Sequence, residues 1–568
     1  MPSSVRIPFF RPAEPHVTPV IAPTANYPVH IDQDNFEVVR RNAAPHRRQA
    51  HSAARAATPS EGIPTLLSST APTTYTTRTL IIGTGFSGMG MAIQLLRSGQ
   101  SDFLIIDKAD DFGGTWRDNT YPGCACDVPA HMYSFSFEPN SRWSKLWAEQ
   151  PEIFDYMKSV AAKHDLQRYT HFGRTFTGAE WNETSQTWTA TTAEGDTYEA
   201  EFLVSGVGAL HIPSIPRFTG DEEFTGTSFH SARWDHSVDL RGKKVAVIGT
   251  GASAIQFIPQ IVDDVAELHL YQRTPAWVLP RTNVPIPAPA RAAITRVPGL
   301  RKAIRGSLYS IQESLAFGLN GNANVMKPLE SLGKWNVARS IKDPELRRKL
   351  TPDYRIGCKR ILGSSTYYPA LAREHTTVVT GGIEHFTATG IVGADGVERE
   401  ADVIIYGTGF HVTDSMDSVD IIGRDGLNLG EQWRDKGMKT HLGITVNGFP
   451  NAFFLLGPNT GLGHNSVVFM IEQQIGYILE AMRIANQRDS AVEVTVAAQR
   501  AFNDEIQEKL AAGVWSTGGC KSWYLDAQGV NRTIWPGYTF QYKARTRKVN
   551  VSDFVVHKKR EDSLPAAS

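Results

Sequence analysis

One local pattern occurs twice in this chain and limits the folds open to it: an apolar strand, a glycine turn, an apolar helix and a second strand. The first copy, TLIIGTGFSGMGMAIQLLRSGQSDFLIIDK, starts at residue 79, and the second, KKVAVIGTGASAIQFIPQIVDDVAELHLYQR, spans 243–273. Such a strand–helix–strand unit builds a parallel sheet covered by helices. We therefore predict an α/β protein with two dinucleotide-binding, Rossmann-like domains.

The first copy has the residues of a phosphate-binding turn. Gly83, Gly85 and Gly88 form a GxGxxG pattern between the strand and the helix. The first glycine permits the tight turn, the second lets the backbone approach a pyrophosphate, and the third lets helix and strand pack closely. Asp107 ends the second strand, 24 residues after Gly83. A carboxylate there accepts hydrogen bonds from ribose hydroxyls and repels a 2′-phosphate, so this loop predicts FAD or NAD.

The second copy has the opposite charge at the ribose position. Gly249, Gly251 and Ala254 form GxGxxA, and Arg273, followed by Thr274, stands at the same 24-residue interval. A guanidinium suits a 2′-phosphate, which predicts NADPH, although Arg273 could also be a solvated strand end. One FAD site and one NADPH site in a single chain indicate hydride transfer to a flavin.

The amino-acid composition and the hydrophobic pattern of the chain change along its length. Residues 1–76 are rich in proline, alanine, serine and threonine, and stretches between 288 and 350 have a helical pattern. We predict these segments: an N-terminal extension over 1–76, an FAD-binding domain from 77–212 and from 406–568 with the C-terminal tail, an NADPH-binding domain from 213–287 and 353–405, and a helical insertion over 288–352.

Composition excludes several functional classes. Lysine plus arginine and aspartate plus glutamate each number 58, so no net charge favours a nucleic-acid partner. No apolar run reaches the roughly 18 residues of a membrane helix, and no secretory signal is visible. Arginines near residue 40 leave a mitochondrial transit peptide open, but the acids of that segment oppose it. We therefore expect a cytoplasmic protein without an integral membrane segment.

The cysteines fit that expectation. None of them forms a CxxC pair or has metal-ligand spacing, so we expect a reduced protein without a disulfide framework and without a metal site. The pair nearest the first glycine loop is separated by a single residue, which argues against a flavoprotein disulfide reductase. The reduced flavin is then expected to react with oxygen. The four residues are Cys124, Cys126, Cys358 and Cys520.

Two longer motifs carry a more specific resemblance. GGTWRDNTYPGCACD at 113–127 and FTGTSFHSARWD at 224–235 together resemble the fingerprints of type I Baeyer-Villiger monooxygenases. The resemblance covers about residues 77–545. The matching residues are Gly114, Trp116, Tyr121, Pro122, Gly123 and Asp127 in the first motif and Phe224, Gly226, His230, Trp234 and Asp235 in the second. Further agreement comes from GCKR at 357–360, DVIIYGTGF at 402–410, GPNTGLGHNS at 457–466 and SWY at 522–524.

The resemblance implies conversion of a ketone to an ester or lactone with NADPH and O2, through a C4a-peroxyflavin. It implies that Arg360 is the catalytic cation and that Asp127 orients it, because a peroxide anion needs a fixed positive charge. His230 would lie on the segment joining the two domains, with a hinge or structural role favoured over proton transfer. The remaining implied cofactor contacts are Thr115, Trp116, Tyr133, Lys359 and Trp523, with Asp127 and Arg360 shared between both roles.

Other functions stay open at this stage. A flavin monooxygenase that oxidises nitrogen or sulfur shares the nucleotide loops, but its histidine motif ordinarily does not end in Trp-Asp or Trp-Pro. A flavin-bound sensor that lost oxygenation is a second alternative, opposed by the intact Asp127 and Arg360. Relatives often carry glutamate where this chain has Asp107, and we expect no change of cofactor from that difference. The identity of the ketone and the oligomeric state are not predicted.

Overall fold

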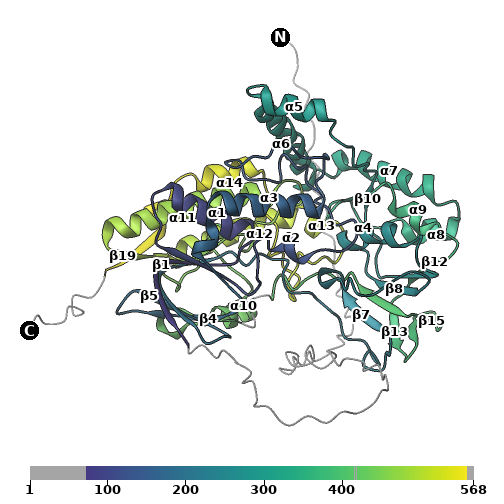
Figure 1. Cartoon of the computed structure of the whole chain (residues 1–568), viewed down its shortest axis with the longest axis horizontal. Helices are drawn as coiled ribbons and strands as arrows, with labels where there is room; N and C mark the ends of the chain where they lie inside the picture. Colours follow the sequence, from purple (N-terminus) through teal and green to yellow (C-terminus); the bar gives the residue numbers. More distant parts are fainter. Residues whose placement is uncertain (1–71, 415, 417–418, 559–568) are drawn as a thin grey trace, which may run out of the picture. The chain divides into compact units, whose positions relative to one another are not determined.

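The computed structural model describes residues 72–414, 416 and 419–558, coloured along the sequence in Figure 1. Most of the predicted N-terminal extension, and the C-terminal tail from residue 559, lie outside the described residues. Two separate β-sheets, each covered by helices, form the α/β fold predicted from the sequence. Within the described part of the chain, none of the helices combines the length and apolarity that a membrane crossing requires.

The larger sheet contains the first glycine loop. Its strand order is β17-β4-β5-β6-β1-β2-β3, and β18 also pairs with β6. β1 runs parallel to β2 and β6, so the carboxyl ends of these strands meet at one edge. Its strands are β1 (Thr74–Ile82), β2 (Phe103–Asp107), β3 (Thr170–Phe172), β4 (Phe176–Asn182), β5 (Thr187–Thr192), β6 (Thr197–Ser205), β17 (Asp420–Ile422) and β18 (Ala452–Phe454).

The second glycine loop belongs to a smaller, fully parallel sheet. Its order is β12-β9-β8-β16-β7, and a short antiparallel sheet of β13, β14 and β15 follows β12 in the chain. The strands are β7 (Thr227–His230), β8 (Lys244–Ile248), β9 (Glu267–Gln272), β12 (Thr376–Thr380), β13 (Ile383–Phe386), β14 (Gly390–Gly393), β15 (Glu398–Glu400) and β16 (Val403–Tyr406).

Four helices interrupt the smaller sheet between β9 and β12, where the sequence pattern predicts a helical insertion. They stand between β10 and β11, a two-residue parallel pair. Proline begins α8, and the Asp343 carboxylate accepts hydrogen bonds from two of its first N–H groups, which is a standard N-cap. The elements are β10 (Val278–Leu279), α5 (Ala288–Arg296), α6 (Leu300–Leu319), α7 (Ala323–Ser340), α8 (Pro344–Leu350) and β11 (Leu362–Gly363).

The remaining helices cover the sheets. α1 packs on α11, and Gly90 makes this possible because a Cβ there would lie 2.9 Å from Ile475 and 3.0 Å from Phe135. The other elements are α1 (Phe86–Arg97), α2 (Thr115–Asp118), α3 (Gln150–Lys163), α4 (Ala252–Ile261), α9 (Tyr367–Leu371), α10 (Leu429–Lys436), α11 (Val467–Arg488), β19 (Ser490–Val494), α12 (Val496–Ala512), α13 (Val514–Thr517), α14 (Thr539–Thr546) and β20 (Phe554–Lys558).

Two chain segments run side by side between the two sheets. The Ser214 N–H donates to the Gly409 carbonyl at 2.9 Å, and the His411 N–H donates to the Ile212 carbonyl at 2.9 Å. Pro213 and Phe410 form the antiparallel bridge between these bonds. The paired segments join the larger sheet to the smaller one in both chain directions. Their pairing therefore fixes the position of the parallel strands of one sheet relative to those of the other sheet.

Candidate functional site

The first glycine loop leads into helix α1, whose first N–H groups are not capped by any side chain. Gly83 has φ +103°, a conformation that favours glycine. A Cβ on Gly88 would lie 1.9 Å from the Gly83 carbonyl oxygen, whereas one on Gly85 would meet only Gly114, at 3.8 Å. No side chain caps α1. Its first N–H groups are thus left for an outside acceptor such as a pyrophosphate.

Asp107 lies beside this loop at the end of β2. One carboxylate oxygen accepts from the Thr84 N–H at 2.8 Å and from the Thr84 hydroxyl at 2.6 Å. The other accepts from the Ala109 N–H at 2.9 Å and lies 3.6 Å from the Arg117 guanidinium. A carboxylate offers about four acceptor positions, so capacity for a ribose hydroxyl remains. The structure therefore fits the predicted role of Asp107, which stays a prediction.

An aromatic cluster borders the same loop. The Trp116 indole N–H donates to the Tyr133 hydroxyl at 3.1 Å, and the two rings meet edge to face at 5.6 Å. Tyr133 also packs edge to face on Phe86, the first residue of α1. Trp116 is buried, while Thr115 at the start of α2 is exposed. The sequence-predicted contacts Thr115, Trp116 and Tyr133 thus lie together beside the glycine turn.

The second glycine loop repeats the first in geometry. Gly249 has φ +108°, and a Cβ on Gly251 would meet only the Gly407 carbonyl oxygen, at 3.8 Å. Ala254, the residue in place of a third glycine, is fully buried. No side chain caps α4. This loop therefore also leads into a helix N-terminus without a side-chain cap, which suits a pyrophosphate.

Cations gather beside the second loop. Arg273 follows β9 and is exposed, and among the described residues no acceptor contacts its guanidinium. The Lys359 ammonium donates to the Thr274 hydroxyl at 2.9 Å. Burial and the neighbouring Arg273 charge lower the pKa of Lys359, and Asp353 partly opposes them. Two neighbouring cations that form no ion pair within the described residues are typical of a phosphate site.

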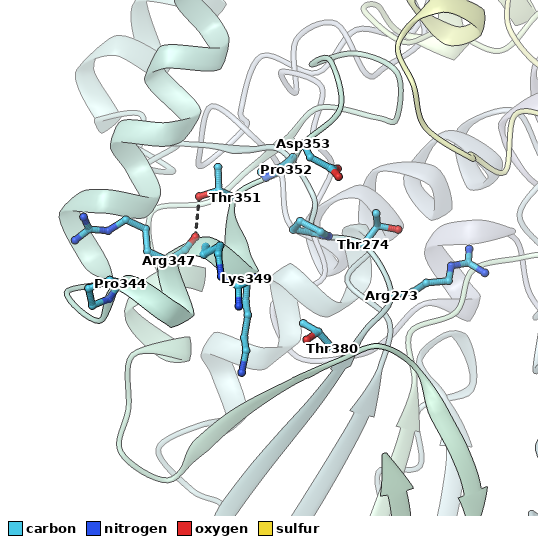
Figure 2. Close-up of a pocket in the computed structure, with 11 residues that line it drawn as sticks. Arg273, Thr274, Pro344, Arg347, Lys349, Thr351, Pro352, Asp353 and Thr380 are labelled. Atoms are coloured by element: carbon cyan, nitrogen blue, oxygen red, sulfur yellow. Dashed lines mark hydrogen bonds between the residues drawn. The ribbon is translucent and has the colours of Figure 1, made fainter. Parts of the chain in front are cut away.

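Figure 2 shows the cavity of about 710 Å³ that opens here, between the carboxyl ends of β9 and β12 and helix α8. The Arg347 side chain points away from Arg273 in this view, and its guanidinium donates to the Ile341 carbonyl at 2.8 Å. Lys349 pairs with Glu345 at 3.1 Å. Arg348 also lines the cavity and is exposed, and no acceptor in the described part of the chain contacts its guanidinium. Helix α8 lies in the predicted helical insertion, but its RRK run carries no sequence pattern that indicates a binding site.

The predicted catalytic pair is formed. The Arg360 guanidinium donates to both Asp127 carboxylate oxygens, at 2.5 and 2.6 Å, and to the Leu462 carbonyl at 3.2 Å. Burial would raise the pKa of Asp127, but the charge and hydrogen bonds of Arg360 hold it below its ordinary value. The Asp127 charge in turn raises the pKa of Arg360. Both groups are therefore ionised across the working pH range.

These three contacts orient the guanidinium. An arginine has five N–H groups, so two remain without an acceptor among the described residues. Asp127 comes from the segment after the first loop, and Leu462 from the GPNTGLGHNS motif. Arg360 directly follows Lys359, which lies beside the second loop. The pair thus stands where segments from both sheets meet.

His230 ends β7, beside Tyr406 of β16. Its ring packs edge to face on Phe410, and its Nδ1 accepts from the Ala232 N–H at 3.1 Å. Burial lowers the pKa of His230 to about 4, so the ring is neutral at pH 7. Trp234 packs on Phe257 of α4. His230 therefore lies against the connection between the sheets, Trp234 lies against α4, and neither residue contacts Arg360. Their structural role stays a prediction.

The cysteine prediction is wrong at one pair. Cys358 and Cys520 form a disulfide, while Cys124 and Cys126 are free and buried. Their separation of 162 residues hid the pairing, because spacing along the chain does not report contact across a fold. Trp523, three residues after Cys520, is 46% exposed. In the described residues, no group of metal-ligating side chains is found.

Comparison with known proteins identifies the family. Residues 81–150 match NAD(P)-binding Rossmann-like domains, and residues 140–284 match L-lysine 6-monooxygenases and L-ornithine 5-monooxygenases. A Baeyer-Villiger monooxygenase of Pseudomonas aeruginosa is 50% identical over 86% of this chain and 94% of its own. One from Streptomyces coelicolor is 46% identical over 84% and 92%.

Solved structures agree with the sequence relatives. The structure of cyclohexanone monooxygenase from Rhodococcus bound to NADP+ matches with a TM-score of 0.77 and 27% identity, over 86% of this chain and all of the other. These matches span both sheets and the helical insertion, so they concern the whole described fold rather than one nucleotide loop. The chain therefore belongs to the Baeyer-Villiger monooxygenases, flavoproteins that use FAD and NADPH.

Proposed function

We propose that this enzyme converts a ketone to an ester or lactone by using Arg360, held by Asp127, to stabilise the charge that develops at the reacting carbonyl. Ketone, NADPH, a proton and O2 give ester, NADP+ and water. The observation that carries the proposal is the two-point pairing of Arg360 with Asp127 where segments of both sheets meet. The names of the relatives support the reaction class.

The first glycine loop would hold FAD. The pyrophosphate would take the free N–H groups of α1 above Gly85, and Asp107 would accept from the ribose. Trp116 and Tyr133 would border the flavin side of the loop. When bound, FAD accepts hydride from NADPH and activates O2 for attack on the carbonyl.

The second loop would hold NADPH. Its pyrophosphate would take the free N–H groups of α4 above Gly251, and Arg273, Thr274 and Lys359 would surround the 2′-phosphate. The cavity in Figure 2 would receive this end of the coenzyme, and Arg348 of α8, which also lines this cavity, would add a further cation to it. The helical insertion would then contribute to coenzyme binding.

Arg360 acts as a fixed, permanent cation in this proposal. Asp127 and the Leu462 carbonyl engage three of its N–H groups, and the other two can donate to a carbonyl oxygen as it gains negative charge. Because these contacts exist before substrate arrives, little reorganisation is needed during the reaction. A lysine could not reproduce the paired geometry.

The test separates flavin reduction from ketone oxidation. Arg360→Ala is expected to be reduced by NADPH without oxygen at a rate within several-fold of wild type, but to form ester at least about 100-fold more slowly. Arg360→Lys keeps the charge and serves as the matched control, with a smaller loss. Ester formation retained by Arg360→Ala would overturn the role of this residue. Sulfoxide or hydroxylamine products with little ester would instead favour the heteroatom-oxidising alternative.

A further inference from the structure

The disulfide between Cys358 and Cys520 joins two segments that both belong to the candidate site. Cys358 directly precedes Lys359 and Arg360, and Cys520 stands three residues before Trp523. A Cβ on Gly518 would lie 2.6 Å from the Cys358 Cβ, so the two segments are already in close contact. The covalent bond therefore fixes the segment that carries Trp523 against the one that carries the catalytic arginine.

Few other interactions restrain the segment 518–523. The Gly518 carbonyl accepts from the Arg355 N–H at 3.0 Å. Within the described residues, the backbone groups of Gly519 and Lys521 make no hydrogen bond. Lys521 and Trp523 are exposed, whereas Tyr524, the next residue, is 1% exposed and anchors the far end. At the far end the Ser522 carbonyl accepts from the Leu525 N–H at 3.1 Å, and the Ser522 hydroxyl accepts from the Tyr524 N–H at 3.1 Å. Opening the disulfide would therefore leave residues 519–521 held only at their two ends, by Gly518 and Ser522.

We propose that Cys358 and Cys520 are a site of reversible thiol oxidation, at which hydrogen peroxide closes the bond and thereby restrains Trp523 beside the coenzyme site. The modification site itself stands on the disulfide and the surroundings of the segment. Its effect on catalysis rests on the proposed function, because Lys359 is taken there as a coenzyme contact and the family resemblance implies the same of Trp523. Peroxide is the product that a flavin monooxygenase releases when NADPH and O2 are consumed without oxidation of substrate.

The oxidation balances with the groups present. Cys520 is half-buried while Cys358 is fully buried, so the Cys520 thiolate is the one that peroxide can reach. It attacks one peroxide oxygen, the O–O bond breaks, and a sulfenic acid forms while the leaving hydroxide takes up the proton that the thiol released and becomes water. Cys358 then attacks the Cys520 sulfur, the S–S bond forms and a second water leaves. Two thiols have lost two electrons to one peroxide, and a small-molecule dithiol reverses the change.

The site would give the enzyme a response to its own side reaction. With the bond open, the segment 518–523 moves more freely and NADP+ is held less firmly, so more oxygen leaves as peroxide instead of entering the ketone. That peroxide closes the bond. The closed disulfide again restrains the segment 518–523 and lowers the share of oxygen that leaves as peroxide.

The first experiment tests the site without measuring ketone oxidation. The intact enzyme is exposed to peroxide or to dithiothreitol, and its thiols are counted after denaturation. We expect two free thiols after peroxide and four after dithiothreitol, with the Cys358 and Cys520 peptides linked only in the oxidised form. Trypsin should release the fragment that begins at Ser522 several-fold faster from the reduced form, while cleavage after Lys436 keeps its rate. Four thiols after peroxide, or equal cleavage after Lys521, would refute the site.

The second experiment measures the share of consumed NADPH that appears as peroxide. Reduction of wild type should raise this share at least twofold. Cys520→Ser should behave like the reduced enzyme and no longer respond to dithiothreitol, whereas Cys124→Ser should respond like wild type. An unchanged share would refute the catalytic effect even if the thiol counts are as expected. A protein that makes no ester but shows both thiol states would refute the proposed function and leave the modification site standing.

Discussion

The two glycine loops are nearly the same in backbone and differ in the charge that follows them. Gly83 and Gly249 have φ +103° and +108°, and each faces the carbonyl of a glycine that follows a neighbouring strand. After the next strand, Asp107 is held by three internal hydrogen bonds, whereas Arg273 is exposed and has no acceptor among the described residues. The same loop backbone is thus followed by a carboxylate with fixed orientation, Asp107, in the first site and by a cation that is unpaired within the described residues, Arg273, in the second. We therefore infer that the residue after each turn, and not the turn itself, decides which nucleotide is bound.

The third loop position breaks the similarity in a different way. At Gly88 there is no room for a methyl group, because its Cβ would lie 1.9 Å from a backbone oxygen. At Ala254 the methyl group is accommodated and fully buried. Helix α1 therefore lies closer to its strand than α4 does to its own. The same alanine side chain should be tolerated in one loop and excluded from the other.

The largest expected effect follows from this contrast. Gly88→Ala should displace α1 and lose most of the bound flavin, at a cost in unfolding free energy of about 3 kcal/mol or more. Ala254→Gly, the matched change in the second loop, should cost about 1 kcal/mol and keep the flavin. The ratio of flavin absorbance to protein, with thermal unfolding, measures both. A Gly88→Ala protein with full flavin and unchanged stability would remove the proposed difference.

The second effect concerns the strand that pairs with β6 in the larger sheet and the strand that pairs with β16 in the smaller sheet. β18 ends at Phe454 beside β6, and β7 ends at His230 beside β16, both buried. Burial lowers the pKa of His230 to about 4, against about 6.5 in the unfolded chain. Between pH 4 and pH 6.5 the unfolded state binds more protons at this residue than the folded state does. The contribution of neutral His230 to the free energy of unfolding is therefore full above pH 6.5 and is lost as the pH falls toward 4. We expect this change in the free energy of unfolding to reach at most about 3 kcal/mol.

Denaturant unfolding of wild type and His230→Gln at several pH values measures this contribution. The difference in unfolding free energy between the two proteins should shrink as the pH falls from 6.5 toward 4, because only wild type has the titrating group. Other buried histidines act in both proteins and cancel. A difference that is constant with pH would show that His230 titrates normally.

The third effect tests the ribose positions directly. Arg273→Ala should lower kcat/KM for NADPH by roughly 10- to 100-fold, because a charge-assisted contact to the 2′-phosphate is lost. The same variant should change kcat/KM for NADH by less than about threefold, because NADH has no such phosphate. Steady-state oxidation of both coenzymes gives the comparison. Equal losses for the two coenzymes would contradict the assigned role of Arg273.

Much of this comparison was predictable from the sequence, because glycine spacing and the charge at a fixed interval are local properties. Asp127 and Arg360 lie 233 residues apart, and only motif resemblance suggested their pairing, which the structure now shows as two hydrogen bonds. The disulfide could not be foreseen because cysteine spacing carries no information about folded distance. The cavity wall formed by α8 was missed for the same reason. A surface helix rich in arginine has no pattern that reveals which side chains face a cavity.

The smallest expected effect is at that wall. Arg348 lines the same cavity as Arg273, and no acceptor among the described residues contacts its guanidinium. Because Arg348 is exposed, its contribution to phosphate binding is screened by water and salt. Arg348→Ala should lower kcat/KM for NADPH by about two- to fivefold at low salt and leave NADH unaffected. The loss should shrink as ionic strength rises. Lys342→Ala, an exposed lysine just before α8 that does not line the cavity, is the matched control and should change neither coenzyme. If both variants lower NADPH use equally, the effect is general electrostatics, and the helical insertion makes no specific contribution to coenzyme choice.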